Sequence, residues 1–240
     1  MANAFHREIL QLIIDHSGTP TRHTFLDSYL GNDHMRYPIS NPVLRGIARV
    51  WMKEHRNMSV SSFSKLLSSL IKGKSSTEKC MAGILLDYAT PEQRKFDPKL
   101  FDQWLDYLIG WAEVDTLCTG KYTTTEIPEN WKAWKPLLIK LSKSRNIQKR
   151  RASLVLLCSP MRSVEDDRLG KLALENIERL KSEKEILITK AISWLLRSME
   201  KHYRTLLVEY LNKNLDSLPP IAVRETMTKI KTGRKTKKRV

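Results

Sequence analysis

The stretch "GWAEVDTLC" (residues 110–118) has the apolar spacing of an α-helix rather than of a strand. When the pattern is continued back to residue 104, five positions at intervals of four and three residues share one helical face. They are Trp104, Leu108, Trp111, Asp115 and Cys118. Four of them are apolar or aromatic, whereas the fifth is a carboxylate that follows a tryptophan by one helical turn. The pattern predicts a helix over about 98–118 with an acid on its apolar stripe.

The same helical periodicity recurs along the rest of the chain, and no run of alternating β-branched residues predicts a strand. A first stripe covers 5–13, a short helix is expected at 22–31, and another begins at Asn41, with Asn41 as N-cap and Pro42 in the first turn. Further helices are expected at about 60–72, 76–90, 98–118, 129–144, 146–159, 163–181, 183–199, 200–214 and 220–230. Ser163 is expected to cap the helix whose first turn carries acids at 165–167, which suit the positive end of the helix dipole.

Helix pairs recur at roughly 40 residues, which is the period of HEAT-type repeats. We therefore expect an all-α fold, an α-solenoid of HEAT-like helix pairs with a concave basic groove. The domain is expected to span 1–228 and to be followed by a basic, disordered tail over 229–240. A compact helical bundle is the structural alternative.

Positive charge dominates the composition, with 42 Lys and Arg against 26 Asp and Glu and a net charge of +16. The tail "KIKTGRKTKKRV" (229–240) holds seven basic residues and no acid, so the preceding residues still carry +9. Residues 130–164 contain nine basic side chains and no acid. A one-sign stretch of this length favours a surface that contacts nucleic-acid phosphates over an ordinary solvated face.

Other classes of protein are disfavoured by motifs that the chain lacks. Cys80, Cys118 and Cys158 are scattered in apolar contexts and are expected to be reduced core thiols of a cytoplasmic, nucleoid-associated protein. Residues 1–18 do not resemble a signal peptide, and no apolar run approaches the length of a membrane span. Because nucleotide-binding, zinc-binding and hydrolase motifs are missing, we expect no metal and no cofactor.

Three residues on three predicted helices have neighbours that are unusual for their type. Asp115 lies on an apolar stripe, although it could also be a surface carboxylate or a buried acid paired to a lysine. Arg151 lies on the stripe of "NIQKRRASLVLLC" and could grip a phosphate, or tie two helices together by an ion pair. Trp194 is flanked on one helical face by Lys190 and Arg197, which suits contact with sugar and phosphate, although a core tryptophan is equally expected.

Taken together, five segments resemble the bacterial DNA alkylation repair glycosylases of the AlkD family, in order and in approximate spacing. They are "YLGNDHMRYPISNPVLRGIARVW" (29–51), "GWAEVDTLC", "NIQKRRASLVLL", "ITKAISWLLRSMEK" (188–201) and "LPPIAVRETMTKI" (218–230). The combination of W-x-x-V-D, N-I-x-x-x-R and K-A-I-x-W-x-L-R carries the resemblance, which extends over about residues 5–230.

The resemblance implies a metal-independent alkylpurine DNA glycosylase of base excision repair, which releases N3- and N7-alkylated purines from duplex DNA without flipping the base. Asp115 resembles the catalytic carboxylate of the family, and Trp111 and Trp194 resemble the aromatics that flank the sugar. Arg151 resembles a phosphate-gripping arginine, and Tyr29 resembles another groove residue. The other basic residues expected to contact DNA are Lys149, Arg150, Lys190 and Arg197. We expect a monomer that does not bind membranes.

The sequence departs from the family pattern at Pro38, where glycine is common, and at Ala112, where a second acid often follows the tryptophan and here Glu113 stands one place later. These departures bear on substrate range and rate more than on fold. Two other functions share the same features: a non-catalytic HEAT-like protein that binds distorted or branched DNA, and a HEAT-type scaffold for protein interactions.

Overall fold

A computed structural model describes residues 3–20 and 31–236. In these two ranges the chain forms thirteen α-helices and one short 3-10 helix, η2 (Leu105–Tyr107), and no strand, so the predicted all-α class is confirmed. The helix predicted at 22–31 lies outside the described residues. Backbone contacts divide the chain into two compact units, residues 1–122 and 123–240. No helix of the described part is long and apolar enough to cross a membrane.

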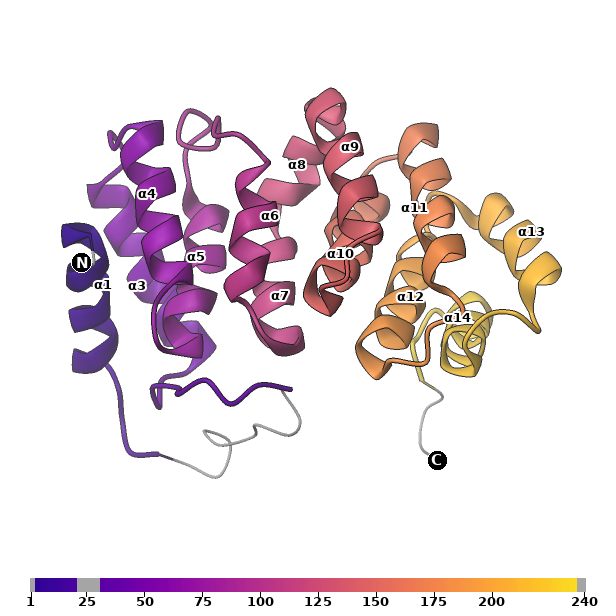
Figure 1. Cartoon of the computed structure of the whole chain (residues 1–240), viewed down its shortest axis with the longest axis horizontal. Coiled ribbons are helices and arrows are strands. Elements are labelled where there is room, and N and C mark those ends of the chain that lie inside the picture. Colours follow the sequence, from indigo (N-terminus) through magenta and orange to yellow (C-terminus); the bar gives the residue numbers. More distant parts are fainter. Residues whose placement is uncertain (1–2, 21–30, 237–240) are drawn as a thin grey trace. The chain divides into compact units, whose positions relative to one another are not determined.

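The first unit contains α1 (Ala4–Asp15), α3 (Asn41–Glu54), α4 (Val60–Ile71), α5 (Ser76–Tyr88), α6 (Leu100–Trp104) and α7 (Gly110–Cys118), and the start of α8 (Lys121–Glu129). Helix α5 packs against α3 on one side and α7 on the other, so these three form one layer (Figure 1). Helix α4 packs against α5 from the second layer, and α1 packs against both α3 and α4. Trp51, Phe63 and Trp104 fill the core between the layers.

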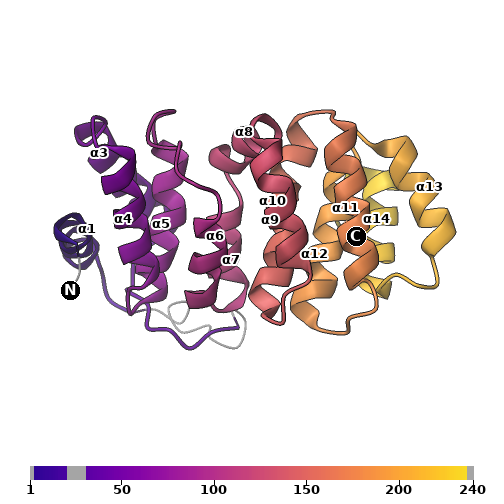
Figure 2. The same ribbon diagram turned by 45° about the horizontal axis from the view of Figure 1, so that its top comes forward.

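The second unit contains α9 (Trp131–Ser142), α10 (Ile147–Ser163), α11 (Asp167–Leu180), α12 (Ile186–Ser198), α13 (Arg204–Asn214) and α14 (Pro220–Thr232). Helices α10, α12 and α14 pack in succession as one layer, and α9 and α11 pack against α10 from the second layer (Figure 2). Two layers of successive helices are what paired-helix repeats predict. The HEAT-like character and the basic groove stay predictions.

The single helix predicted over 98–118 is wrong, because the chain breaks between η2 and α7. Leu108 and Ile109 are extended, and Gly110 begins α7 with a φ of +74°, which glycine adopts without strain. Trp104 and Leu108 therefore do not share a helix with Asp115. Only Trp111, Asp115 and Cys118 of the predicted stripe lie on one helix.

Some helices begin at other residues than predicted, because a neighbouring residue occupies the N-cap position. Ser163 is the last residue of α10, and Asp166 caps α11 by accepting from the Arg168 N–H at 2.9 Å. Asn41 is the first residue of α3, after Ser40 at the N-cap position. Helix α8, rich in threonine, was not predicted. The predicted start of the tail at 229 lies inside α14, which continues to Thr232; residues 237–240 lie outside the described residues.

Candidate active site

The first turn of α7 is fixed by a buried acid, Glu113. One Glu113 carboxylate oxygen accepts a hydrogen bond from the Ile109 backbone N–H at 2.9 Å, which satisfies a donor ahead of the helix. The other lies 2.8 Å from His34 Nδ1. Glu113 is fully buried, so it is a structural acid rather than one that contacts solvent. From the sequence alone, Glu113 is notable only as an acid one position after the place where the family often has one.

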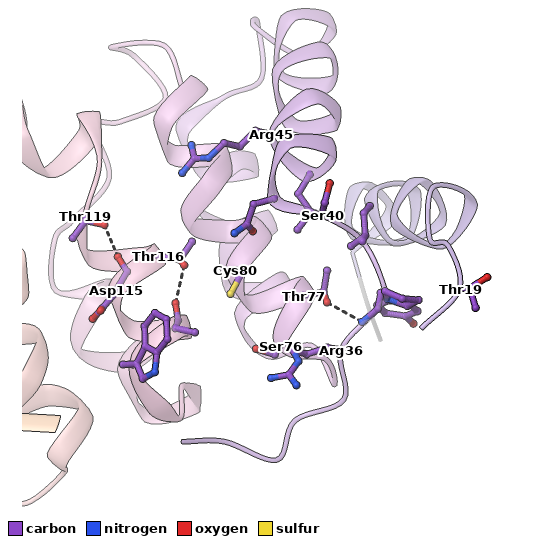
Figure 3. Close-up of a pocket in the computed structure, with 17 residues that line it drawn as sticks. Thr19, Arg36, Ser40, Arg45, Ser76, Thr77, Cys80, Asp115, Thr116 and Thr119 are labelled. Atoms are coloured by element: carbon purple, nitrogen blue, oxygen red, sulfur yellow. Dashed lines mark hydrogen bonds between the residues drawn. The ribbon is translucent and has the colours of Figure 1, made fainter. Parts of the chain in front are cut away.

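Trp111 and Asp115 are one turn apart on α7, and both line a cavity of about 620 Å³ in the first unit. The opposite walls come from the segment 36–41 and the start of α3, and from Ser76, Thr77 and Cys80 on α5 (Figure 3). Both side chains are partly exposed. The Thr119 hydroxyl donates to the backbone carbonyl oxygen of Asp115 at 2.7 Å, near the end of α7. The structure therefore brings together an indole and a carboxylate on one wall of an open cavity.

The cavity contains cations as well as this acid. Arg36 and Arg45 line it from the loop and from α3. Arg45 Nη1 lies 2.9 Å from Asp87 Oδ2, and this hydrogen bond raises the pKa of Arg45. Burial raises the pKa of the Cys80 thiol to about 11, so the thiol is protonated at neutral pH and is a poor nucleophile. Among the described residues that line the cavity, Asp115 is the one carboxylate.

Two of the predicted arginines of the second unit, Arg150 and Arg151, lie on α10 and hydrogen-bond to neighbouring elements. Arg151 is 4% exposed and donates from Nη1 to the Leu187 carbonyl oxygen beyond the end of α11, which ties α10 to the start of α12. Arg150 forms a two-pronged ion pair with Glu183, with distances of 2.7 Å and 3.0 Å, and donates to two carbonyl oxygens of the preceding loop. Lys149 is partly exposed. The DNA-binding roles of these residues stay predictions.

Trp194 lies on α12 and is partly exposed, unlike Trp51, Trp104 and Trp134, which are each at most 2% exposed. Lys190, one turn before it, is exposed. Arg197 is half-buried, and its Nε lies 3.5 Å from the Glu225 carboxylate of α14, which also accepts from the Ser193 hydroxyl at 2.6 Å. Burial lowers the pKa of Arg197. The helical spacing predicted that Lys190 and Arg197 flank Trp194. It could not predict that Glu225, from another helix, lies beside Arg197.

The predicted site residues thus fall into two groups. Trp111 and Asp115 share one cavity in residues 1–122, whereas the predicted residues on α10 and α12 lie on two helices that pack together in residues 123–240. That both groups contact one duplex stays a prediction. Tyr29 lies outside the described residues. No group of three or more His, Cys, Asp or Glu side chains in the described part of the chain could hold a metal ion.

Comparisons with known proteins bear on the fold and the family of the chain. The structure is similar to that of a solved protein titled "Predicted DNA alkylation repair enzyme from Enterococcus faecalis", with a TM-score of 0.71 and 17% identity over 90% of this chain and 99% of that one. At this identity the likeness shows the fold alone. No curated protein matches the chain. The model of one family, described as DNA alkylation repair enzyme, matches residues 11–230. The chain therefore belongs to the DNA alkylation repair enzyme family.

Proposed function

We propose that the protein is a DNA glycosylase that hydrolyses the N-glycosidic bond of N3- and N7-alkylated purines in duplex DNA. The observation that carries the proposal is the placement of Trp111 and Asp115 one turn apart on α7, lining one open cavity in a member of this family. The net charge of +16 supports DNA as the substrate, because neutralised phosphates supply sequence-independent affinity.

The chemistry needs a negative charge beside the sugar. Alkylation at N3 or N7 makes the purine cationic, so it leaves readily with the electron pair of the glycosidic bond. Positive character then develops at the sugar C1′, and a fixed carboxylate and an indole face stabilise that charge more than they stabilise the ground state. Water adds its oxygen to C1′ and loses a proton to Asp115 or to solvent. No metal is required, because the leaving group is already activated.

In this proposal the base is released without being flipped out of the duplex, and the protein contacts the sugar and phosphates around it. Trp194, like Trp111, is proposed to contact the sugar of the lesion. The proposed phosphate contacts of the second unit are Lys149, Arg150, Arg151, Lys190 and Arg197. Tyr29 is a further groove contact.

The direct test is mass spectrometry of the bases freed from dimethyl sulfate-treated duplex DNA by the purified protein, with and without EDTA. The proposal predicts free 7-methylguanine and 3-methyladenine in both conditions, and none from untreated DNA. Tight DNA binding with no freed base would replace it with the non-catalytic DNA-binding alternative. Absence of DNA binding at moderate salt would favour the protein-interaction scaffold.

Removing either proposed aromatic should slow base release without abolishing it. We expect Trp111→Ala and Trp194→Ala each to reduce the rate by about 2–30-fold, the equivalent of a cation–π contact of about 0.5–2 kcal/mol. Single-turnover release of 7-methylguanine measures this. Trp131→Ala is the matched control, because Trp131 is partly exposed on α9 and stacks with Arg168 at 5.5 Å. Wild-type rates in both test variants would exclude the aromatic contacts.

Arg151→Ala should weaken DNA binding and lower the slope of log affinity against log salt by about one. Fluorescence anisotropy with unmethylated duplex at several salt concentrations measures both quantities. The variant should also unfold at a lower temperature, because it loses the contact with the Leu187 carbonyl. A lower melting temperature with an unchanged salt slope would show that Arg151 links α10 to α12 and does not contact phosphate.

A further inference from the structure

The segment 31–40, between α1 and α3, is held by hydrogen bonds to the starts of two helices. The Ser76 N–H donates to the Met35 carbonyl at 2.8 Å, and the Tyr37 N–H donates to the Thr77 hydroxyl at 3.0 Å, which binds the segment to the first turn of α5. Asn32 Nδ2 donates to the Ile109 carbonyl at 3.2 Å, which binds it to α7. The segment therefore has a defined path although it contains no helix.

Glu113 joins this segment to the helix that carries Asp115. Its two carboxylate oxygens contact His34 in the segment and the Ile109 N–H ahead of α7, so one buried acid fixes both. The approach is close: a Cβ built on Gly31 would lie 3.6 Å from the Gly110 Cα. Glu113 lies between Trp111 and Asp115 in sequence. Its contacts therefore fix the segment 31–40 to the turn of α7 that carries these two cavity residues.

Arg36 is the charged side chain among the residues 36–40 with which this segment lines the cavity. It is half-buried, and Figure 3 shows its guanidinium beside Ser76, on the same cavity as Asp115. The positive charge of Arg36 acts to lower the pKa of the Cys80 thiol on α5, although burial raises that pKa by more. Arg45, which also lines the cavity, has its Nη1 2.9 Å from Asp87 Oδ2. Arg36 therefore brings positive charge into the space beside the proposed catalytic acid.

We infer that Arg36 binds a DNA phosphodiester next to the sugar that Asp115 faces, and that Glu113 and His34 are positioning residues for this contact. The inference rests on the proposed function. A guanidinium has a planar pair of N–H donors that matches two phosphate oxygens. A phosphate bound by Arg36 fixes the sugar–phosphate backbone relative to α7, because Glu113 fixes the segment that carries Arg36 to the same helix.

The test is binding of unmethylated duplex DNA by Arg36→Ala and Arg36→Gln, measured by fluorescence anisotropy across a salt series. We expect about a 5–10-fold loss of affinity near 0.1 M salt and a salt slope lower by about one, as for loss of one phosphate contact. Arg56→Ala is the matched control, because Arg56 is an exposed arginine of the same unit that does not line the cavity. The inference would be overturned if Arg36→Ala and Arg36→Gln lost no more affinity than Arg56→Ala, or if they left the salt slope unchanged.

Glu113→Gln tests the positioning role. The variant keeps the size of the side chain but replaces the carboxylate that contacts His34 Nδ1 and the Ile109 N–H. We expect it to weaken binding by less than Arg36→Ala does, and we expect the double variant to bind no more weakly than Arg36→Ala alone. Additive losses would show that Glu113 acts elsewhere. Because binding is measured on unmethylated DNA, a wild-type protein that releases no base would overturn the proposed function while leaving this outcome readable.

Discussion

Asp115→Asn is expected to reduce the release of 7-methylguanine by at least about 100–1,000-fold, the usual cost of removing a group that stabilises transition-state charge. The asparagine keeps the size of the side chain and loses the negative charge that we propose stabilises the developing sugar cation. Release from methylated duplex under single-turnover conditions measures the effect. DNA affinity should stay equal or rise, since the variant removes a carboxylate from a surface that approaches phosphates.

Two controls make this result specific. Glu92→Gln removes an acid of the same unit that forms only an exposed ion pair with Lys95, and it should release base at the wild-type rate. The melting temperature of Asp115→Asn should match that of the wild type, which separates lost chemistry from lost folding. Wild-type release by Asp115→Asn would remove this residue from the mechanism.

Gly83→Ala should have the largest effect on stability, because Gly83 is where α5 meets the backbone of α7. A Cβ there would lie 2.9 Å from the Leu117 Cα and closer still to the Thr116 carbonyl oxygen, and backbone atoms cannot rotate away. We expect a loss of about 1–3 kcal/mol of unfolding free energy, typical of an overpacked core. For a chain of this size that is a fall in melting temperature of about 2–12 °C.

The same substitution should slow base release, because moving α7 away from α5 moves Asp115 in the cavity. Gly46→Ala on α3 is the matched control, since a Cβ at Gly46 has no atom within 4 Å. An alanine in an open helical position should leave stability unchanged or raise it by about 0.5–1 kcal/mol. Calorimetry of the two variants makes the comparison, and equal melting temperatures would contradict the close contact between α5 and α7.

Helical periodicity was enough to predict the all-α class, although α5 and α10 are buried over most of their length rather than on one face. It failed where single residues decide the backbone. The break ahead of α7 depends on the left-handed conformation of Gly110 and on Glu113, which accepts the Ile109 N–H; neither changes the apolar spacing around them. The end of α10 was misplaced because Ser163 and Asp166 are both good caps, and only the packing of the chain selects Asp166.

The candidate site was predictable in part for a similar reason. Trp111 and Asp115 lie one helical turn apart, so spacing alone places them on one face. Arg36 lies on a segment with no periodicity, and its approach to the cavity depends on contacts with residues about 40 and 80 positions away. The Arg150–Glu183 and Arg197–Glu225 pairs likewise join different elements, which no local pattern reveals.

The charge of the leaving base gives the most direct test of the role proposed for Asp115. Two duplexes that differ at one position, 7-methylguanine in one and O6-methylguanine in the other, present a cationic and a neutral purine in the same sequence. Single-turnover release from both should be compared for wild-type protein and Asp115→Asn. We predict release of 7-methylguanine alone, and only by the wild type. Equal release of both bases, or release of 7-methylguanine that does not depend on Asp115, would contradict the mechanism.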